Sequence, residues 1–216
     1  MLPGSDADAK NIKRGDVFLS VNNEQLTINN YYELLNSEEE SYSIQLAEIN
    51  EGTVTPTSKS IDLVKAEIQE NPIHIQKVIE LNNKKIGYLM YNAFVADFDA
   101  ELESVLAGFQ TQGVSDLIID LRYNRGGRTS SSIKLASMIT GQFSGELIAQ
   151  TKHNAKLSSL NESQQFDSNP VQLGLTQLYV ISSSSTASAS ELLINGLSPY
   201  IDVILVGDHT TGKNVG

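Results

Sequence analysis

The chain has 216 residues, no cysteine and a formal net charge of −11. This length allows one large domain or two small ones. Without cysteine, disulfides, thiolate metal sites and cysteine nucleophiles are excluded. The negative charge argues against nucleic acid or an anionic membrane as a partner, and no apolar run approaches the ~18 residues that span a bilayer.

The N-terminal part of the sequence predicts a small α+β module. In chain order, the patterns predict a short helix over 5–12, a strand over 17–21, a helix over 28–35 and a strand over 41–47. Thr27 is expected to cap the second helix. Gly52, Pro56 and Pro72 interrupt the pattern that follows, so residues 53–72 are expected to form a linker.

From residue 73 the sequence predicts strands alternating with helices. Strands are expected over 73–79, 85–91, 117–121, 178–181 and 203–206, and helices over 97–112, over 130–138 and after Ser188. The interval 151–170 is polar and predicts a surface excursion. The run 117–121 is apolar except for Asp120, as expected for a strand buried on both faces. This alternation predicts an α/β fold with a mixed, largely parallel sheet and flanking helices.

Ser188 lies at the predicted start of a helix, in Thr186-Ala-Ser-Ala-Ser-Glu191. One interpretation is a capping box, in which the serine caps the helix and Glu191 reaches back three residues later. The other is a nucleophile. In that case the N–H of Ala189 can stabilise an oxyanion, and the small neighbours Ala187 and Ala189 leave room for a substrate backbone.

A pair of glycines, Gly126 and Gly127, follows the predicted strand 117–121. Open α/β sheets bind ligands at the carboxyl edge of their strands, where such a turn exposes free N–H groups. One of these two N–H groups is a candidate partner of the Ala189 N–H in an oxyanion hole. A plain strand-to-helix turn is the alternative interpretation.

Lys213 follows the predicted strand 203–206 and is a candidate base, because a lysine can replace histidine in activating a serine. Gly207 and Gly212-Lys213 have the spacing of a phosphate-binding loop, but Asn214 stands where that motif needs Ser or Thr. A solvated lysine in a turn stays a third interpretation. A Ser-His-Asp arrangement with His153 or His209 is left open, although no motif favours it.

Together these segments resemble the carboxyl-terminal processing (tail-specific) family of serine peptidases over residues 73–216. The motifs that carry the resemblance are Ile86-Gly87-Tyr88, Asp120-Leu121-Arg122-Tyr123-Asn124-Arg125-Gly126-Gly127, Thr186-Ala187-Ser188-Ala189-Ser190-Glu191 and Gly212-Lys213. The resemblance implies a crotonase/Clp-protease-like peptidase core with Ser188 as nucleophile and Lys213 as its base. It also implies cleavage of protein or peptide substrates near their C-termini, with no metal, nucleotide or other cofactor.

Residues 1–52 resemble part of a PDZ domain, the peptide-tail reader that these peptidases carry. The match rests on Pro3-Gly4-Ser5 and on residues 13–22. In the family, the loop that grips the substrate carboxylate lies earlier, so we expect the chain to be a truncated piece of a longer protein. By the same resemblance the protein is expected to be exported and periplasmic, with its export signal upstream.

The sequence leaves the last catalytic details open. A lysine acts as a base only when neutral, so Lys213 is expected to be buried. No third residue that orients Lys213 can be named, because Pro199 stands where some family members have an acidic residue, and Asp202 is out of register. The rival hypothesis is a non-catalytic peptide-tail-binding module or an inactive fragment. The oligomeric state cannot be read from the sequence.

Overall fold

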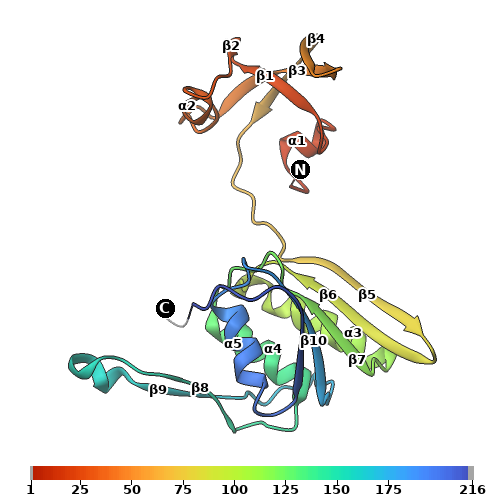
Figure 1. Cartoon of the computed structure of the whole chain (residues 1–216), viewed down its shortest axis with the longest axis vertical. Helices are drawn as coiled ribbons and strands as arrows, with labels where there is room; N and C mark the ends of the chain where they lie inside the picture. Colours follow the sequence, from red (N-terminus) through yellow and green to blue (C-terminus); the bar gives the residue numbers. More distant parts are fainter. Residues whose placement is uncertain (1, 214–216) are drawn as a thin grey trace. The chain divides into compact units, whose positions relative to one another are not determined.

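A computed structural model describes residues 2–213, and the chain divides into two compact units on either side of residue 70 (Figure 1). The first unit is an antiparallel sheet with strand order β2-β1-β3-β4 and two short helices. Its elements are α1 (Asp6–Ala9), β1 (Val17–Val21), β2 (Glu24–Gln25), α2 (Tyr31–Leu35), β3 (Ser41–Asn50) and β4 (Thr53–Val64). Its core is small and consists of Ile12, Val21, Ile44, Ile61 and Leu63.

The expected linker over 53–72 is wrong for its first part, because β4 pairs with β3. Glu51 and Gly52 have φ values of 49° and 82°, which is the backbone of a two-residue hairpin turn. Pro56 is tolerated because β4 is an edge strand, where a missing N–H breaks no interior ladder. The interruptions in the sequence therefore mark a hairpin instead of a linker.

Helix α2 begins later than predicted. Thr27 is not its N-cap, because the Thr27 hydroxyl and N–H both donate to Asn30 Oδ1, at 2.8 and 2.7 Å. These bonds hold residues 27–30 in a turn, and the helix begins at Tyr31 with Asn30 as N-cap.

The second unit contains a five-stranded sheet with strand order β11-β10-β7-β6-β5. Its strands are β5 (Ile73–Leu81), β6 (Lys84–Tyr91), β7 (Asp116–Asp120), β10 (Gln177–Ser182) and β11 (Asp202–Gly207). Strands β6, β7, β10 and β11 pair in parallel, and only β5 is antiparallel to its neighbour. The prediction of a mixed, largely parallel sheet with flanking helices is confirmed.

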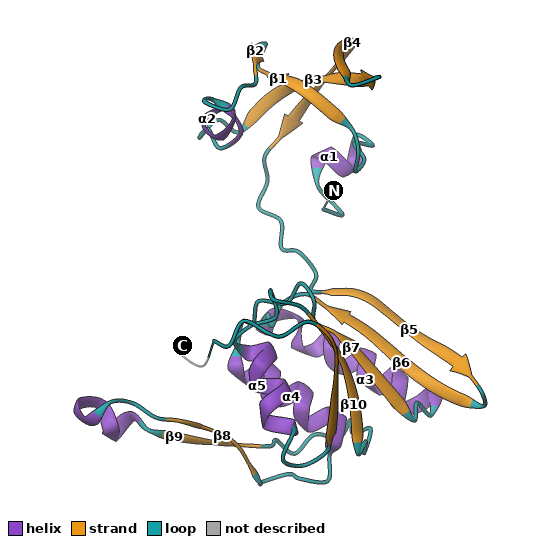
Figure 2. Ribbon diagram, in the orientation of Figure 1, coloured by secondary structure: helices purple, strands orange, loops and turns teal. Residues whose placement is uncertain are grey.

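Three helices pack together in this unit (Figure 2). They are α3 (Asp99–Gln112), preceded by the 3-10 turn η1 (Ala96–Phe98), α4 (Thr129–Thr140) and α5 (Ala189–Leu197). The predicted stop at Gly113 is confirmed, since Gly113 caps α3 in the left-handed conformation that glycine adopts without strain. Fully buried strand residues such as Leu117, Ile119 and Val180 join the helices in one core.

Strand β7 is completely buried on one face only, which corrects the prediction that both faces are covered. Leu117 and Ile119 are fully buried, but Ile118, on the opposite face, is half-buried. The same alternation appears in β10, where Leu178 and Val180 are buried and Tyr179 is not. In the sequence the two faces do differ, because Ile118 shares its face with Asp116 and Asp120.

The polar interval after α4 holds structure that the sequence did not predict. Strands β8 (Leu147–Thr151) and β9 (Glu162–Gln165) form a hairpin that carries the 3-10 segment η2 (Ala155–Leu160). In Figure 1 the hairpin extends away from the helices and the five-stranded sheet. Its strands are short and mostly exposed, so the apolar alternation that would predict them is missing.

Candidate active site

The predicted site residues come from loops that follow parallel strands. The carboxyl ends of neighbouring parallel strands meet at one edge of a sheet. The glycine loop follows β7, the Ser188 turn follows β10 and the Lys213 segment follows β11. The order β11-β10-β7 makes these three strands neighbours, so their loops meet at this edge.

Ser188 has an unusual backbone at the N-terminus of α5. Its φ and ψ are 55° and −115°, a region that side chains other than glycine rarely adopt and that costs about 1–3 kcal/mol. Such strain is typical of turns that present a nucleophile between a strand and a helix. Ala187 and Ala189 are buried on either side, and Ser188 itself is half-buried.

Glu191 links the Ser188 turn to the Lys213 segment. Its Oε2 accepts the N–H of Ser188 at 2.8 Å and the N–H of Lys213 at 2.9 Å. Its Oε1 accepts the Thr210 hydroxyl at 2.6 Å and the N–H of Gly212. The backbones of the predicted nucleophile and the predicted base therefore converge on one carboxylate.

The environment of Glu191 favours its charged form. Glu191 is 5% exposed, and burial by itself raises the pKa of a carboxyl group. The hydrogen bonds from Thr210, Gly212, Ser188 and Lys213 outweigh burial and hold the pKa of Glu191 below its usual range. A negative charge at the N-terminus of α5 also complements the helix dipole.

The expected burial of Lys213 is wrong, because the residue is exposed. A lysine is kept neutral near pH 7 by burial. The Lys213 segment is nevertheless fixed. The Thr211 N–H donates to the Thr186 carbonyl at 2.9 Å, and the Thr211 hydroxyl donates to the Ser184 carbonyl at 2.9 Å. The Lys213 backbone is thus held beside the Ser188 turn.

The glycine loop packs directly on the Ser188 turn. A Cβ on Gly126 would lie 2.7 Å from the Ser188 Cβ and 3.0 Å from the Ala189 nitrogen, so only glycine fits there. The Gly126 N–H donates to Asn124 Oδ1 at 2.8 Å, which removes Gly126 as a free donor. Among residues 2–213, the N–H groups of Gly127 and Ala189 have no acceptor.

Asn124 holds the glycine loop and the Ser188 turn together, a role that the sequence did not reveal. The residue is fully buried. Its Nδ2 donates to the Tyr91 carbonyl at 3.0 Å, and its own carbonyl accepts the Ala187 N–H at 3.2 Å and the Ser190 hydroxyl at 3.1 Å. Ser190 therefore stabilises the turn through its hydrogen bond to Asn124.

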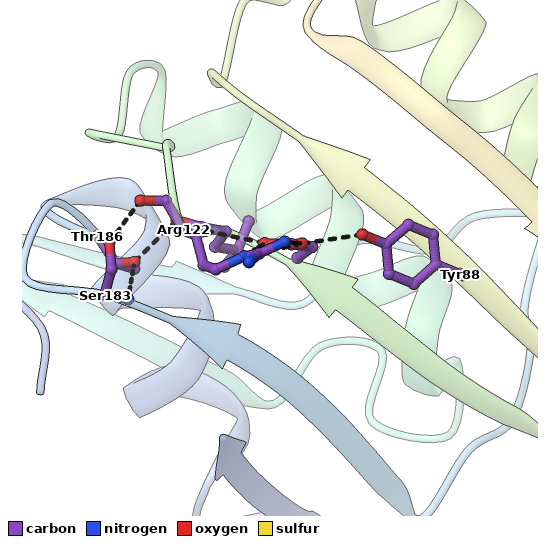
Figure 3. A network of polar contacts seen from close by, with 6 residues as sticks. Tyr88, Arg122, Ser183 and Thr186 are labelled. Atoms are coloured by element: carbon purple, nitrogen blue, oxygen red, sulfur yellow. Dashed lines mark hydrogen bonds and ion pairs between the residues drawn. The ribbon is translucent and has the colours of Figure 1, made fainter. Parts of the chain in front are cut away.

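A second carboxylate, Asp120, is buried where β7 ends. It belongs to a polar network that includes Tyr88 and Arg122 (Figure 3). Arg122 donates to both of its oxygens, with Nη2 2.7 Å from Oδ2, and Tyr88 donates its hydroxyl to Oδ2 at 2.8 Å. Burial opposes the charge of Asp120, but Arg122 and then Tyr88 keep its pKa below the usual range. The Arg122 carbonyl accepts the Ser183 hydroxyl at 2.5 Å, so this network reaches the loop that leads to Ser188.

The alternative Ser-His-Asp arrangement requires a histidine that is hydrogen-bonded to Ser188. His209 pairs with Asp208 at 2.6 Å, and both side chains are exposed. His153 lies in the β8–β9 hairpin and is also exposed. Within residues 2–213, neither has a hydrogen bond to Ser188.

Within residues 2–213, no three His, Asp or Glu side chains lie close enough together to hold a metal ion. No helix in that range has both the length and the apolar character needed to cross a bilayer.

Alanine at Gly127 is expected to destabilise the second unit by more than about 2 kcal/mol. Its Cβ would lie 2.2 Å from the Phe94 carbonyl oxygen, at a φ of 132° that alanine adopts only with strain. Urea unfolding measures the change. Gly108→Ala is the matched control, because nothing lies within 4 Å of its Cβ, and helix propensity predicts a gain of about 0.5–1 kcal/mol. Equal stabilities of the two variants would contradict the packing described for the loop.

Known proteins resemble this chain over most of its length. The model of peptidase family S41 matches residues 85–216. A carboxyl-terminal-processing protease of Picosynechococcus sp. is 28% identical over 214 residues, which cover 99% of this chain and 50% of that protein. A chloroplastic C-terminal processing peptidase of Tetradesmus obliquus is 24% identical over 226 residues, with 99% and 47% covered.

A solved structure from Bacteroides fragilis, named as an S41 protease, superposes with a TM-score of 0.76 and 28% identity. It covers 100% of this chain, which in turn covers 59% of that structure. The chain spans about half the length of the curated relatives described above. Because the family model matches more than half of its residues, the chain belongs to peptidase family S41.

Proposed function

We propose that this protein is a serine endopeptidase that cleaves protein substrates near their C-termini, with Ser188 as nucleophile and Lys213 as base. The observation that carries the proposal is the shared acceptor Glu191 Oε2, which binds the N–H groups of both residues. The strained backbone of Ser188 adds support, because such strain is kept where a surrounding network fixes it.

In the proposed reaction, a neutral Lys213 takes the proton of the Ser188 hydroxyl as the oxygen attacks the substrate carbonyl. The oxygen–carbonyl bond forms, and the tetrahedral intermediate collapses to an acyl-enzyme as the amine of the C-terminal fragment leaves with a proton. Water then attacks the acyl-enzyme and releases the shortened substrate. Lys213 must be shielded from solvent to be neutral in this step. A bound substrate that covers the Ser188 turn would provide this shielding.

The oxyanion is assigned to the N–H groups of Gly127 and Ala189. Both lack an acceptor among the described residues, and the loops that carry them are packed together at Gly126. Gly126 contributes to the site by lacking a side chain, which lets the glycine loop pack against the Ser188 turn. Donors that are fixed before the reaction stabilise developing negative charge without reorganising.

The first unit is proposed to belong to a PDZ-like domain that reads substrate tails. Its support is the resemblance of residues 1–52 and the antiparallel sheet with two short helices. The exported, periplasmic location rests on the family resemblance alone and is also a proposal. Cell fractionation with an antibody against the protein tests the location.

The activity is tested by incubating an unfolded, tailed protein with the intact peptidase and determining the new C-termini by mass spectrometry. The proposal expects cuts that cluster near the C-terminus. The rival function, a tail-binding module that does not cut, expects binding of the same protein with unchanged mass. That second result would overturn the peptidase proposal.

A further inference from the structure

A pocket lies beside the glycine loop, and Gly127 is the one proposed site residue that lines it. It has a volume of about 380 Å³ and is lined by residues 94–97, Gly127 and Arg128. Its walls are fixed to each other, because the Phe94 N–H donates to the Gly126 carbonyl at 2.9 Å and the Arg128 N–H donates to the Phe94 carbonyl at 2.8 Å. The pocket therefore adjoins Gly127, whose N–H is assigned to the oxyanion.

Arg128 brings a positive charge to this pocket. It is exposed, and none of the ion pairs among residues 2–213 involves it. It is also the N-cap of α4, whose first turn contains no acidic residue. The N–H groups of residues 129–131 have no acceptor among the described residues, and a helix N-terminus of this kind attracts anions.

The local charge contrasts with that of the whole chain, which is −11. Arg125 is also exposed without an ion pair in the described part of the chain. Asp97 also lines the pocket and has an interaction partner. A substrate side chain that enters the pocket meets the guanidinium of Arg128, which has no ion pair among residues 2–213.

We propose that this pocket is a substrate subsite for a carboxylate next to the scissile bond, and that Arg128 is the residue that selects it. The subsite rests on the proposed peptidase function and names its preferred substrate class. An arginine fork binds both oxygens of a carboxylate, which it cannot do with a neutral amide. The carboxylate can come from an Asp or Glu side chain or from the C-terminus of the substrate.

The first test measures peptide binding to the intact protein carrying Ser188→Ala, so that cleavage cannot interfere. Fluorescein-labelled peptides contain Glu or Gln at each position that flanks the bond, and each peptide is made as a free acid and as a C-terminal amide. The inference expects one Glu position, or the free acid, to bind about 10- to 100-fold more tightly. Arg128→Gln should remove this preference, whereas Arg125→Gln should reduce it less.

Two outcomes would overturn the subsite. One is equal affinity for all Glu, Gln, acid and amide peptides, and the other is a preference that Arg128→Gln leaves unchanged. Cleavage assays with the Ser188 protein report separately on the proposed function, since a protein that binds Glu peptides without cutting them keeps the subsite and loses the peptidase.

Discussion

Replacing Ser188 by alanine is expected to lower kcat/KM for peptide cleavage by about a thousandfold or more. The reason is chemical, since alanine has no oxygen that can form the acyl-enzyme. The turn itself should persist, because Glu191 binds the backbone N–H of residue 188 and the side chain is not needed for that bond. Steady-state cleavage of a fluorogenic peptide measures the loss, and thermal unfolding checks the fold.

Ser190→Ala is the matched control for Ser188→Ala. Ser190 is fully buried and donates to the Asn124 carbonyl at 3.1 Å, so its loss removes one neutral hydrogen bond worth about 1 kcal/mol. Cleavage by this variant should stay within about tenfold of the natural protein. If Ser188→Ala cleaves normally, or if Ser190→Ala loses as much activity, Ser188 is not the nucleophile.

Glu191→Gln is expected to reduce kcat/KM by about a hundredfold and the free energy of unfolding by about 3 kcal/mol. Among residues 2–213, its carboxylate has four donors and no positive partner at hydrogen-bond distance. An amide supplies only one acceptor oxygen and places an NH₂ group against N–H donors. The Ser188 turn and the Lys213 segment would then lose their common anchor.

The pH dependence of stability gives Glu191 a second readout. Because hydrogen bonds hold its pKa in the folded protein below the unfolded value, its contribution is complete above the usual glutamate range. That contribution is lost as the pH falls through the lowered pKa. Urea unfolding at several acidic pH values should therefore show a shallower pH dependence for Glu191→Gln than for the natural protein.

Glu103→Gln is the control for this comparison. Glu103 pairs with Lys134 at 2.8 Å on the surface, and both side chains are partly exposed. Surface pairs of this kind contribute about 0–1 kcal/mol. Equal losses of stability and activity in the two glutamate variants would show that Glu191 has no special role at the site.

Local patterns in the sequence were sufficient to predict most of the second unit. The stripe that ends at Gly113 defines α3, and the apolar run before Asp120 defines β7. The order of the chemical motifs along the chain also predicts which loops meet, because parallel strands bring their carboxyl ends to one edge. The first unit was harder to predict, because its hairpin turn at Glu51-Gly52 interrupts the strand pattern of the sequence.

The details of the site depend on contacts between distant residues, which a local pattern does not carry. Glu191 was expected to serve the helix cap alone, yet it also binds residues 210, 212 and 213. Gly126 and Gly127 look equivalent in the sequence, but Asn124 Oδ1 occupies only the N–H of Gly126. Burial of Lys213 was expected from its proposed chemistry, and the structure shows an exposed residue instead.

A crystal structure of the intact protein with a peptide aldehyde bound at the site tests the proposed pair of Ser188 and Lys213 most directly. We expect a covalent bond from Ser188 Oγ to the aldehyde carbon, with Lys213 Nζ within about 3.2 Å of that oxygen. We also expect the bound peptide to shield the amine from water. An adduct on another residue, or a Lys213 amine that stays in solvent away from Ser188, would contradict the proposed pair.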